Sequence, residues 1–426
     1  MAEKRVIQRK PEAYIGDRQL KPESANMTYG HTSRWSERSI NMPIYLSNTF
    51  DFDSAEEAEK TFRGLSDGTI DALAYSRFNN PNLEKLEDCL ALWDDAEACI
   101  SFSSGMAAID TVLTEFTSPG EFILHSEPLY GGTEKIIKTL FKKFGVNSIG
   151  FNPDDSQEEI EKKILISGAR FDLAMIYIET PANPTLTHID IEMCSRIAQR
   201  FSTREKKVIT CADNTFFGPL WQNPLAHGAD LVFRSDTKYT NGHSDCMGGS
   251  GSGSSDLIGR LRKARNLKGN MQQPFSAWLL CRSLDELKMR MTQQRKNAEK
   301  IANFLASHSA IEKVYYPGLL KPDTRQYDIY KQQCLGPGAM ISFDMRGGKE
   351  SAFRVLIGQN LKPIKIAVSL GGVESLITHP ASTTHYGIPP AELARMGVSD
   401  SLIRLSVGAE DADDLIAALS KALEAA

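Results

Sequence analysis

The chain has 426 residues, of which 41% are hydrophobic and 24% are charged, and its formal net charge is -5 at pH 7. A chain of this length can bury a sizeable core and is expected to hold two or three domains. Its weak negative charge creates no general field that would attract nucleic acid or an anionic membrane, so neither partner is expected.

The sequence shows no targeting segment and no metal-binding pattern. The N-terminus, MAEKRVIQRKPEAY, is basic but lacks the apolar stretch of a signal peptide, and no other window is long enough to span a bilayer. Seven cysteines are scattered without C-x-x-C spacing, and the eight histidines form no H-E-x-x-H pair. We therefore predict reduced thiols, a cytoplasmic location and no metal site.

Residues 1–65 are polar, contain three prolines, and show one strand-like piece at residues 44–52. Such a segment has too little apolar surface for a core of its own. We therefore predict an N-terminal arm that packs on the main body or on a neighbouring subunit. A helical run, AEEAEKTF, and a loop containing Tyr75 and Arg77 lead into the rest of the chain.

Residues 66–264 alternate between short apolar runs and longer amphipathic ones, and they are predicted to form a large α/β domain. The apolar runs are ACISF, EFILH, LAMIYIE, VITCA and DLVF, and helices are expected to begin at Gly105 and Gly131. This alternation is typical of parallel strands joined by right-handed crossovers, which form a wound sheet. Ligands in such sheets bind beyond the carboxyl ends of the strands.

The segment GGSGSGSS at residues 248–255 is predicted to be a flexible or closely approached turn. It is not a phosphate loop of the G-x-x-x-x-G-K type, because no lysine follows at the required spacing. Beyond it, helices are expected at residues 257–265 and 275–307, and strands near residues 311–316, 339–345 and 402–407. Because strict alternation ends here, residues 265–426 are predicted to form a smaller α+β domain.

A lysine follows the last apolar run of the large domain. Residues 231–233 are apolar, and the run stops at Arg234, Ser235, Asp236, Thr237 and Lys238. A lysine at the end of a buried strand can be partly desolvated, which lowers its pKa and frees the amine for attack on a carbonyl. The plainer interpretation is a solvated surface charge. Ser235 to Lys238 also fits the S-x-x-K pattern of serine acyl-transfer enzymes, but the accompanying K-T-G is missing.

Three other strand ends carry polar or aromatic residues. Asp213 ends VITCAD, Tyr130 follows the run EFILH, and Ser103 to Met106 begin a helix whose free N–H groups suit an anion. Alone, each has a plain alternative as a cap, a core ring or an ordinary helix start. Together with Lys238 they supply the amine, carboxylate, stacking ring and phosphate donors that pyridoxal 5'-phosphate (PLP) requires.

The chain closely resembles the Cys/Met-metabolism family of PLP-dependent enzymes, the group of cystathionine γ-synthase and methionine γ-lyase. The resemblance extends from YSRFNNPN through SSGMAAI, PLYGGT, IETPANPT, ADNTF and SDTKYTNGHSD to SLGGVESLITHPASTTH and IRLSVGAED. It implies the type I aminotransferase-like fold, a mostly parallel wound sheet with a smaller C-terminal α+β domain.

The resemblance also implies roles for individual residues. Lys238 would carry the cofactor and act as the catalytic base, Asp213 would pair with the ring nitrogen, and Tyr130 would stack on the ring and act as an acid or base. The remaining assignments are a phosphate site of Gly105, Met106, Ser235 and Thr237 joined by Tyr75 and Arg77 of the neighbouring subunit, and a substrate clamp of Arg404, Asn183 and Ser369. A shared phosphate site implies a dimer as the smallest active unit, and family members are commonly tetramers.

The implied activity is elimination or replacement of the γ-substituent of an amino acid. Val368, an apolar residue where cystathionine-handling members often have a glutamate, favours γ-elimination of the methionine γ-lyase type, which releases a 2-oxo acid and ammonia. Gly131 and Gly132 stand where those lyases carry a cysteine, which favours γ-replacement on an O-acylhomoserine. Asp236, where a small residue is usual, and the GGSGSGSS segment leave open a γ-lyase that acts on a non-sulfur homoserine derivative such as canavanine.

Overall fold

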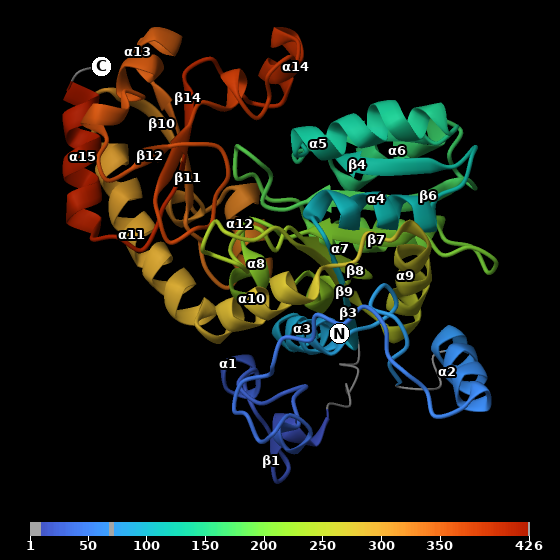
Figure 1. Ribbon diagram of the computed structural model, residues 1–426. Coiled ribbons are helices and arrows are strands. Elements are labelled where there is room, and N and C mark those ends of the chain that lie inside the picture. Colours follow the sequence, from blue (N-terminus) through green and yellow to red (C-terminus); the bar gives the residue numbers. More distant parts are fainter. Residues whose placement is uncertain (1–9, 68–71, 425–426) are drawn as a thin grey trace.

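The computed structural model describes residues 10–67 and 72–424, so residues 1–9 of the predicted arm lie outside the described residues. Two sheets dominate the chain, and they lie side by side with helices packed around them (Figure 1). The described N-terminal segments, including the short helix α1 (Pro22–Ala25) and α2 (Ala55–Asp67), extend from one side of the larger sheet. The predicted strand at residues 44–52 is absent there; Thr49 makes only an isolated bridge with Tyr75.

The larger sheet has seven strands in the order β3-β9-β8-β7-β6-β4-β5. Neighbouring strands are parallel except at β9, which runs antiparallel to both β3 and β8. The strands are β3 (Ala98–Phe102), β4 (Phe122–Ser126), β5 (Asn147–Phe151), β6 (Leu173–Glu179), β7 (Ile209–Asp213), β8 (Leu231–Arg234) and β9 (Gly249–Gly253).

Helices cover both faces of this sheet, as right-handed crossovers require. On one face α4 (Gly105–Phe116) and α9 (Ser255–Lys268) pack their apolar side chains on the strands. On the other face α6 (Gln157–Ile166) and α7 (Ile191–Phe201) do the same. The remaining helices near this sheet are α3 (Pro81–Trp93), α5 (Gly131–Lys135), α8 (Gly218–Trp221) and α10 (Pro274–Asp285).

The smaller sheet has five strands in the order β10-β11-β14-β13-β12. They are β10 (Ile311–Tyr315), β11 (Met340–Met345), β12 (Lys365–Ile366), β13 (Leu376–Thr378) and β14 (Leu402–Ser406). The helices of this part are α11 (Leu287–Ser307), α12 (Arg325–Gln333), α13 (Gly348–Val355), α14 (Pro390–Arg395) and α15 (Ala412–Glu424). The helix predicted over residues 275–307 is in fact two, α10 and α11, which meet at Glu286.

The prediction of a turn at GGSGSGSS is wrong, because this segment contains a fully buried central strand, β9. The glycines of β9 are required because neighbouring atoms leave no room for a side chain. An added Cβ on Gly251 would lie 2.3 Å from the Phe233 ring, and one on Gly249 would lie 2.3 Å from the Ser104 carbonyl oxygen. The sequence signal for flexibility therefore marks close packing between neighbouring elements.

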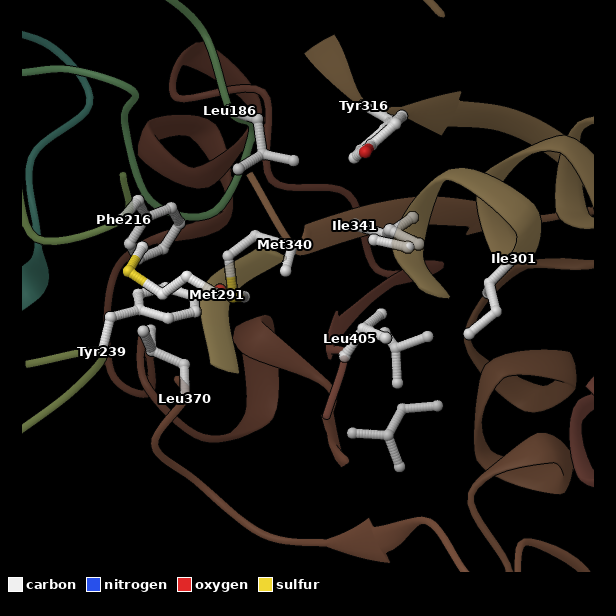
Figure 2. Packing of buried hydrophobic residues seen from close by; sticks show 14 of the residues in the cluster. Leu186, Phe216, Tyr239, Met291, Ile301, Tyr316, Met340, Ile341, Leu370 and Leu405 are labelled. Atoms are coloured by element: carbon white, nitrogen blue, oxygen red, sulfur yellow. The ribbon is translucent and has the colours of Figure 1, made fainter. Parts of the chain in front are cut away.

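One hydrophobic cluster joins the loops of the larger sheet to the smaller sheet. Tyr239, Leu370, Phe216, Met291 and Met340 belong to it and are buried (Figure 2). Tyr239 directly follows Lys238, and Leu370 directly follows Ser369. Because protein cores are close-packed, this cluster fixes two chain segments that are more than a hundred residues apart in the sequence against each other.

Candidate active site

A cavity of about 580 Å³ opens where β6, β7 and β8 end, and its other side is closed by Arg404 on β14 and by loops next to the smaller sheet. The carboxyl ends of parallel strands share one edge of a sheet, so side chains far apart in the sequence converge there. The cavity is lined by the following sequence-predicted residues: Gly105, Met106, Tyr130, Asn183, Asp213, Ser235, Thr237, Lys238, Val368, Ser369 and Arg404.

Lys238 lies in the turn after β8, and its amine points across the cavity. The Nζ atom donates a hydrogen bond of 2.8 Å to Ser369 Oγ. Burial, with a smaller effect from the Arg404 charge, lowers the pKa of Lys238 to about 8. The neutral, nucleophilic form of this amine is therefore well populated near pH 8, whereas an exposed lysine would be almost wholly charged.

Ser369, whose hydroxyl accepts the hydrogen bond from Lys238, has a strained backbone conformation. Its φ is 94°, in the left-handed region that a serine seldom adopts, at a cost of about 1–3 kcal/mol. The Arg404 Nη2 atom donates to the Ser369 carbonyl oxygen at 3.2 Å, and the next residue, Leu370, is anchored in the core. These contacts hold the strained conformation in place.

Asp213 ends β7 with its carboxylate inside the cavity. Oδ1 accepts hydrogen bonds from the backbone N–H of Thr215 at 3.0 Å and from its hydroxyl at 2.6 Å. The Tyr177 hydroxyl donates to Oδ2 at 3.3 Å. Burial raises the pKa of Asp213 against the effect of these hydrogen bonds. A cationic group placed beside this carboxylate would offset the cost of its burial.

The N-terminus of α4 lies against the turn that follows β8. An added Cβ on Gly105 would lie 2.9 Å from the Ser235 Cβ, so only glycine lets the two segments approach this closely. Ser104 caps the helix by accepting from the Ala107 N–H at 3.1 Å. Thr237 is fixed by Gly248, whose N–H donates to the threonine Oγ1 at 3.0 Å. Helix N–H groups next to two hydroxyls form a cradle for an anion.

Arg404, on β14, is buried on the opposite side of the cavity. Its Nη1 atom donates to Asn183 Oδ1 at 2.7 Å, and its Nη2 atom donates to the Ser369 carbonyl oxygen. The guanidinium is therefore held in a fixed orientation by Asn183, in the loop after β6, and by Ser369, in the loop between β12 and β13. A planar, oriented guanidinium is suited to binding a carboxylate through two parallel hydrogen bonds.

Two residues without a predicted role, Glu179 and Thr215, take part in this arrangement. Glu179 ends β6, and it accepts the N–H of Tyr130 at 2.6 Å and that of Asn183 at 2.8 Å. Burial and the neighbouring Asp213 raise the pKa of Glu179 to about 8. Thr215 holds Asp213, as described above. The strand end at Glu179 was a visible signal, whereas nothing in the sequence singled out Thr215.

The structure does not bring Tyr75 and Arg77 to this cavity. Tyr75 is 42% exposed, and the Arg77 Nη1 atom donates to the Asn266 carbonyl oxygen at 2.6 Å. Among the residues that the structure describes, no cluster of histidine, cysteine and acidic side chains has the arrangement of a metal site. No helix in the described ranges is both long enough and apolar enough to cross a membrane.

The donor set of the cavity fits PLP on three separate counts. The cradle between α4 and the turn after β8 suits a phosphate monoester. Asp213 suits a protonated pyridine nitrogen, since the hydrogen bonds to its buried carboxylate come from the neutral Thr215 and Tyr177. Lys238, with its lowered pKa, suits covalent attachment to an aldehyde. A plain phosphate site would account for the first of these features alone.

Comparisons with known proteins agree with this fit. The family model described as Cys/Met metabolism PLP-dependent enzyme matches residues 23–424. An L-methionine γ-lyase of Porphyromonas gingivalis is 38% identical over 384 residues, which are 90% of this chain and 92% of that protein. A cystathionine γ-lyase of Rattus norvegicus is 39% identical over 394 residues, 92% of each chain.

A solved structure shows the same fold over almost the whole chain. It is a cystathionine γ-synthase of Xanthomonas oryzae pv. oryzae in complex with aminoacrylate and cysteine, with a TM-score of 0.85 and 33% sequence identity. The match covers 96% of this chain and 100% of the solved one.

Proposed function

The chain belongs to the Cys/Met-metabolism family of PLP-dependent enzymes, and on that premise we propose that it eliminates the γ-substituent of an uncharged γ-substituted L-amino acid. The reaction would consume one water and release the γ-substituent with its proton, a 2-oxo acid and ammonia, as an activity of the L-methionine γ-lyase kind. The family membership confirms the predicted enzyme class, PLP as cofactor, and the predicted α/β fold.

In this proposal Lys238 holds the cofactor covalently and then moves protons. When bound, PLP withdraws electrons from the α-carbon of the attached amino acid and makes its α-proton acidic. The Nζ atom of Lys238, when not bound to the cofactor, would take that α-proton as the general base. Ser369 Oγ, 2.8 Å from Nζ in this structure, orients the amine. Tyr130 would stack on the cofactor ring and serve as a second acid or base.

The proposed substrate preference follows from the charge and polarity of the residues that line the cavity together with Val368. Asp213 and Glu179 are the only carboxylates among the described residues that line the cavity, and both are engaged by hydrogen bonds within the site. Met106, Met247 and Leu370 supply apolar surface. No carboxylate is left to pair with the distal ammonium group of cystathionine. An uncharged side chain such as that of methionine is therefore the better match.

One observation favours γ-replacement on an O-acylhomoserine as the alternative. The turn after Tyr130 has no side chain at Gly131 or Gly132, and an added Cβ on Gly132 would lie 2.6 Å from the Tyr130 ring. The ring of Tyr130 occupies the space that a side chain at Gly132 would need, so this turn supplies no thiol to the cavity where the resembling γ-lyases carry a cysteine.

A substrate panel tests the proposed reaction. Methionine, cystathionine, canavanine, and O-acetyl- and O-succinylhomoserine with and without cysteine or sulfide would be offered to the PLP-loaded protein. We expect rapid 2-oxobutyrate and ammonia release from methionine, at a higher kcat/KM than with cystathionine. New amino acids formed only when a thiol is present would assign the chain to γ-replacement. Activity confined to canavanine would assign it to the non-sulfur alternative.

The substrate clamp gives a further prediction. The conservative substitution Arg404→Lys should raise KM for the amino acid by about 10- to 100-fold, because an ammonium group replaces two parallel hydrogen bonds with a single point charge. The change in kcat should be smaller. Steady-state kinetics would check this, with Arg395→Lys as a control, since Arg395 lies 54% exposed on α14 outside the cavity. An unchanged KM in Arg404→Lys would remove Arg404 from the clamp.

The proposed oligomer follows from Tyr75 and Arg77, which do not line the cavity of the chain to which they belong. We place Tyr75 and Arg77 at the phosphate site of a neighbouring copy, so that a dimer is the smallest active unit and a tetramer of two such dimers is the expected assembly. The exposure of Tyr75 supports this placement, because its ring is open to a second chain. The domain division at residues 65 and 264 likewise remains a prediction, as does a cytoplasmic location.

A further inference from the structure

A buried charge network lies directly behind the turn that carries Ser235, Thr237 and Lys238. Arg234 donates from Nη1 to Asp94 Oδ1 at 2.5 Å and from Nη2 to Asp94 Oδ2. Its Nε atom lies 3.4 Å from Asp236 Oδ1. The exposed fractions of the three side chains are 2% for Arg234, 3% for Asp94 and 0% for Asp236. Two acidic groups therefore share one guanidinium in the interior.

The serines of β9 complete this network. Side chains alternate between the two faces of a strand, so Ser250 and Ser252 point to the opposite face from Gly249, Gly251 and Gly253. The Ser250 hydroxyl donates to Asp236 Oδ1 at 3.1 Å, and the Ser252 hydroxyl donates to Asp94 Oδ2 at 2.5 Å. The two unusual sequence features, Asp236 and the Gly/Ser segment, thus meet in one structure.

Asp236 is the less satisfied of the two carboxylates. Asp94 receives both Arg234 nitrogens and a hydroxyl, whereas Asp236 Oδ2 has no hydrogen-bond partner among the described residues. With both carboxylates ionised the network carries one excess negative charge. Burial raises the pKa of Asp236 to about 6, although Arg234 and the Ser250 and Thr240 side chains act in the opposite direction.

Besides Lys238, which follows Asp236 by two residues, two thiols also lie near this network. Cys246 lies close enough for the Asp236 charge to raise its thiol pKa. Cys99, on β3, faces the Asp94 and Arg234 side of the network, and burial raises its pKa well above the usual value. Both thiols stay neutral between pH 5 and pH 8. The pKa of Asp236, raised by burial to about 6, lies within that range.

We infer that Asp236 is a positioning residue whose charge state sets how tightly the turn holds the cofactor phosphate. Its neighbours in the sequence, Ser235 and Thr237, belong to the phosphate site that the family resemblance implies, so the inference rests on the proposed PLP-dependent function. An ionised Asp236 places a negative charge behind the site of an anion. A protonated Asp236 leaves the network neutral.

The direction of the pH effect follows from this placement. A bound phosphate makes the ionised form of Asp236 less favourable, so the pKa of Asp236 is higher with cofactor than without it. Cofactor affinity is therefore highest below pH 6, where Asp236 is protonated in the free protein. It declines as the pH rises from the pKa of Asp236 in the free protein to the higher pKa of Asp236 in the loaded protein. Above both values it stays at the lower level.

The test compares wild type with Asp236→Asn, which keeps the size of the side chain and removes its charge. PLP would be titrated into the apo-proteins by equilibrium dialysis between pH 5 and pH 8. We expect equal dissociation constants at pH 5 and about tenfold tighter binding by Asp236→Asn at pH 8, the size of one screened charge interaction. The ionisation of the phosphate and of Lys238 affects both proteins alike and cancels in the ratio. Pyridoxal, which lacks the phosphate, should bind both proteins equally at every pH.

Two serine variants on one strand provide matched controls. Ser250→Ala removes a hydrogen-bond donor that lowers the pKa of Asp236. In this variant the pH at which PLP affinity declines should therefore be higher than in wild type. Ser252→Ala removes the equivalent donor to Asp94 and should leave the pH of the decline unchanged. Thermal unfolding of each apo-protein checks that it is folded, and Asp236→Asn should be stabilised relative to wild type at pH 8 but not at pH 4.

The outcomes separate this inference from the proposed function. The inference would be overturned if the ratio of the wild-type and Asp236→Asn dissociation constants for PLP did not vary with pH. It would also be overturned if this ratio varied with pH for pyridoxal as much as for PLP. In both cases PLP would still bind, and the proposed function would stand. A wild-type protein that binds no PLP at any pH would instead contradict the proposed function itself.

Discussion

The substitution Lys238→Ala is expected to reduce kcat by about a thousandfold or more, because it removes both the covalent attachment point and the base that takes the α-proton. General acid–base catalysis alone contributes about 10²- to 10⁴-fold. The amine is placed for this work by its bond to Ser369 and by a pKa lowered to about 8. Rates of oxo-acid release from the preferred substrate would measure the loss.

Two control variants show whether the loss is specific to this amine. Lys207→Ala removes a lysine that pairs with Asp230 at the surface, and it should keep wild-type activity. Lys238→Arg keeps a positive charge at the site but cannot act as a base at neutral pH, so it should be as inactive as Lys238→Ala. An active Lys238→Ala protein that still contains PLP would contradict the role of Lys238.

The second large effect is expected from Asp213→Asn. The amide has the same size and can still accept the Thr215 hydrogen bonds, but it carries no charge. Removing one partner of a buried charge pair typically costs 3–5 kcal/mol, which is about 10²- to 10³-fold or more in kcat/KM. The cofactor should also dissociate more easily, and this can be measured independently by dialysis.

The size of this effect depends on the charge of Asp213 rather than on its shape. Asp230→Asn, a substitution of an aspartate that binds Lys207 and the Thr210 N–H outside the cavity, serves as the control. It should leave both kcat/KM and cofactor retention near the wild-type values. Equal activity in Asp213→Asn and wild type would mean that no cationic ring nitrogen lies beside this carboxylate.

Most of the candidate site could be predicted because the chemistry lies at strand ends. Lys238, Asp213 and Tyr130 each follow an apolar run of the larger sheet, and parallel topology brings such positions to one edge. The resemblance added residues that follow no such rule, among them Arg404 and Ser369. Arg404 lies on β14 and Ser369 lies in the loop between β12 and β13, and only tertiary packing through Tyr239 and Leu370 determines where they lie.

The misinterpreted segment shows where local sequence patterns fail. Glycine and serine are typical of turns, yet β9 is the buried antiparallel strand between β3 and β8. What decides its structure is the bulk of Phe233 and the Ser104 carbonyl group on one face and the charge network on the other. These neighbours of β9 lie in other segments of the sequence, so the local sequence pattern of β9 cannot indicate them. The same applies to Thr215, which is recognisable only through its bonds to Asp213.

Trapping with borohydride tests the central claim most directly. The PLP-loaded protein would be reduced with borohydride, digested, and its peptides analysed by mass spectrometry. The account predicts that the visible absorption is bleached and that a single phosphopyridoxyl group is found on Lys238. A label on another lysine, or a protein that takes up no PLP and carries no label, would contradict it.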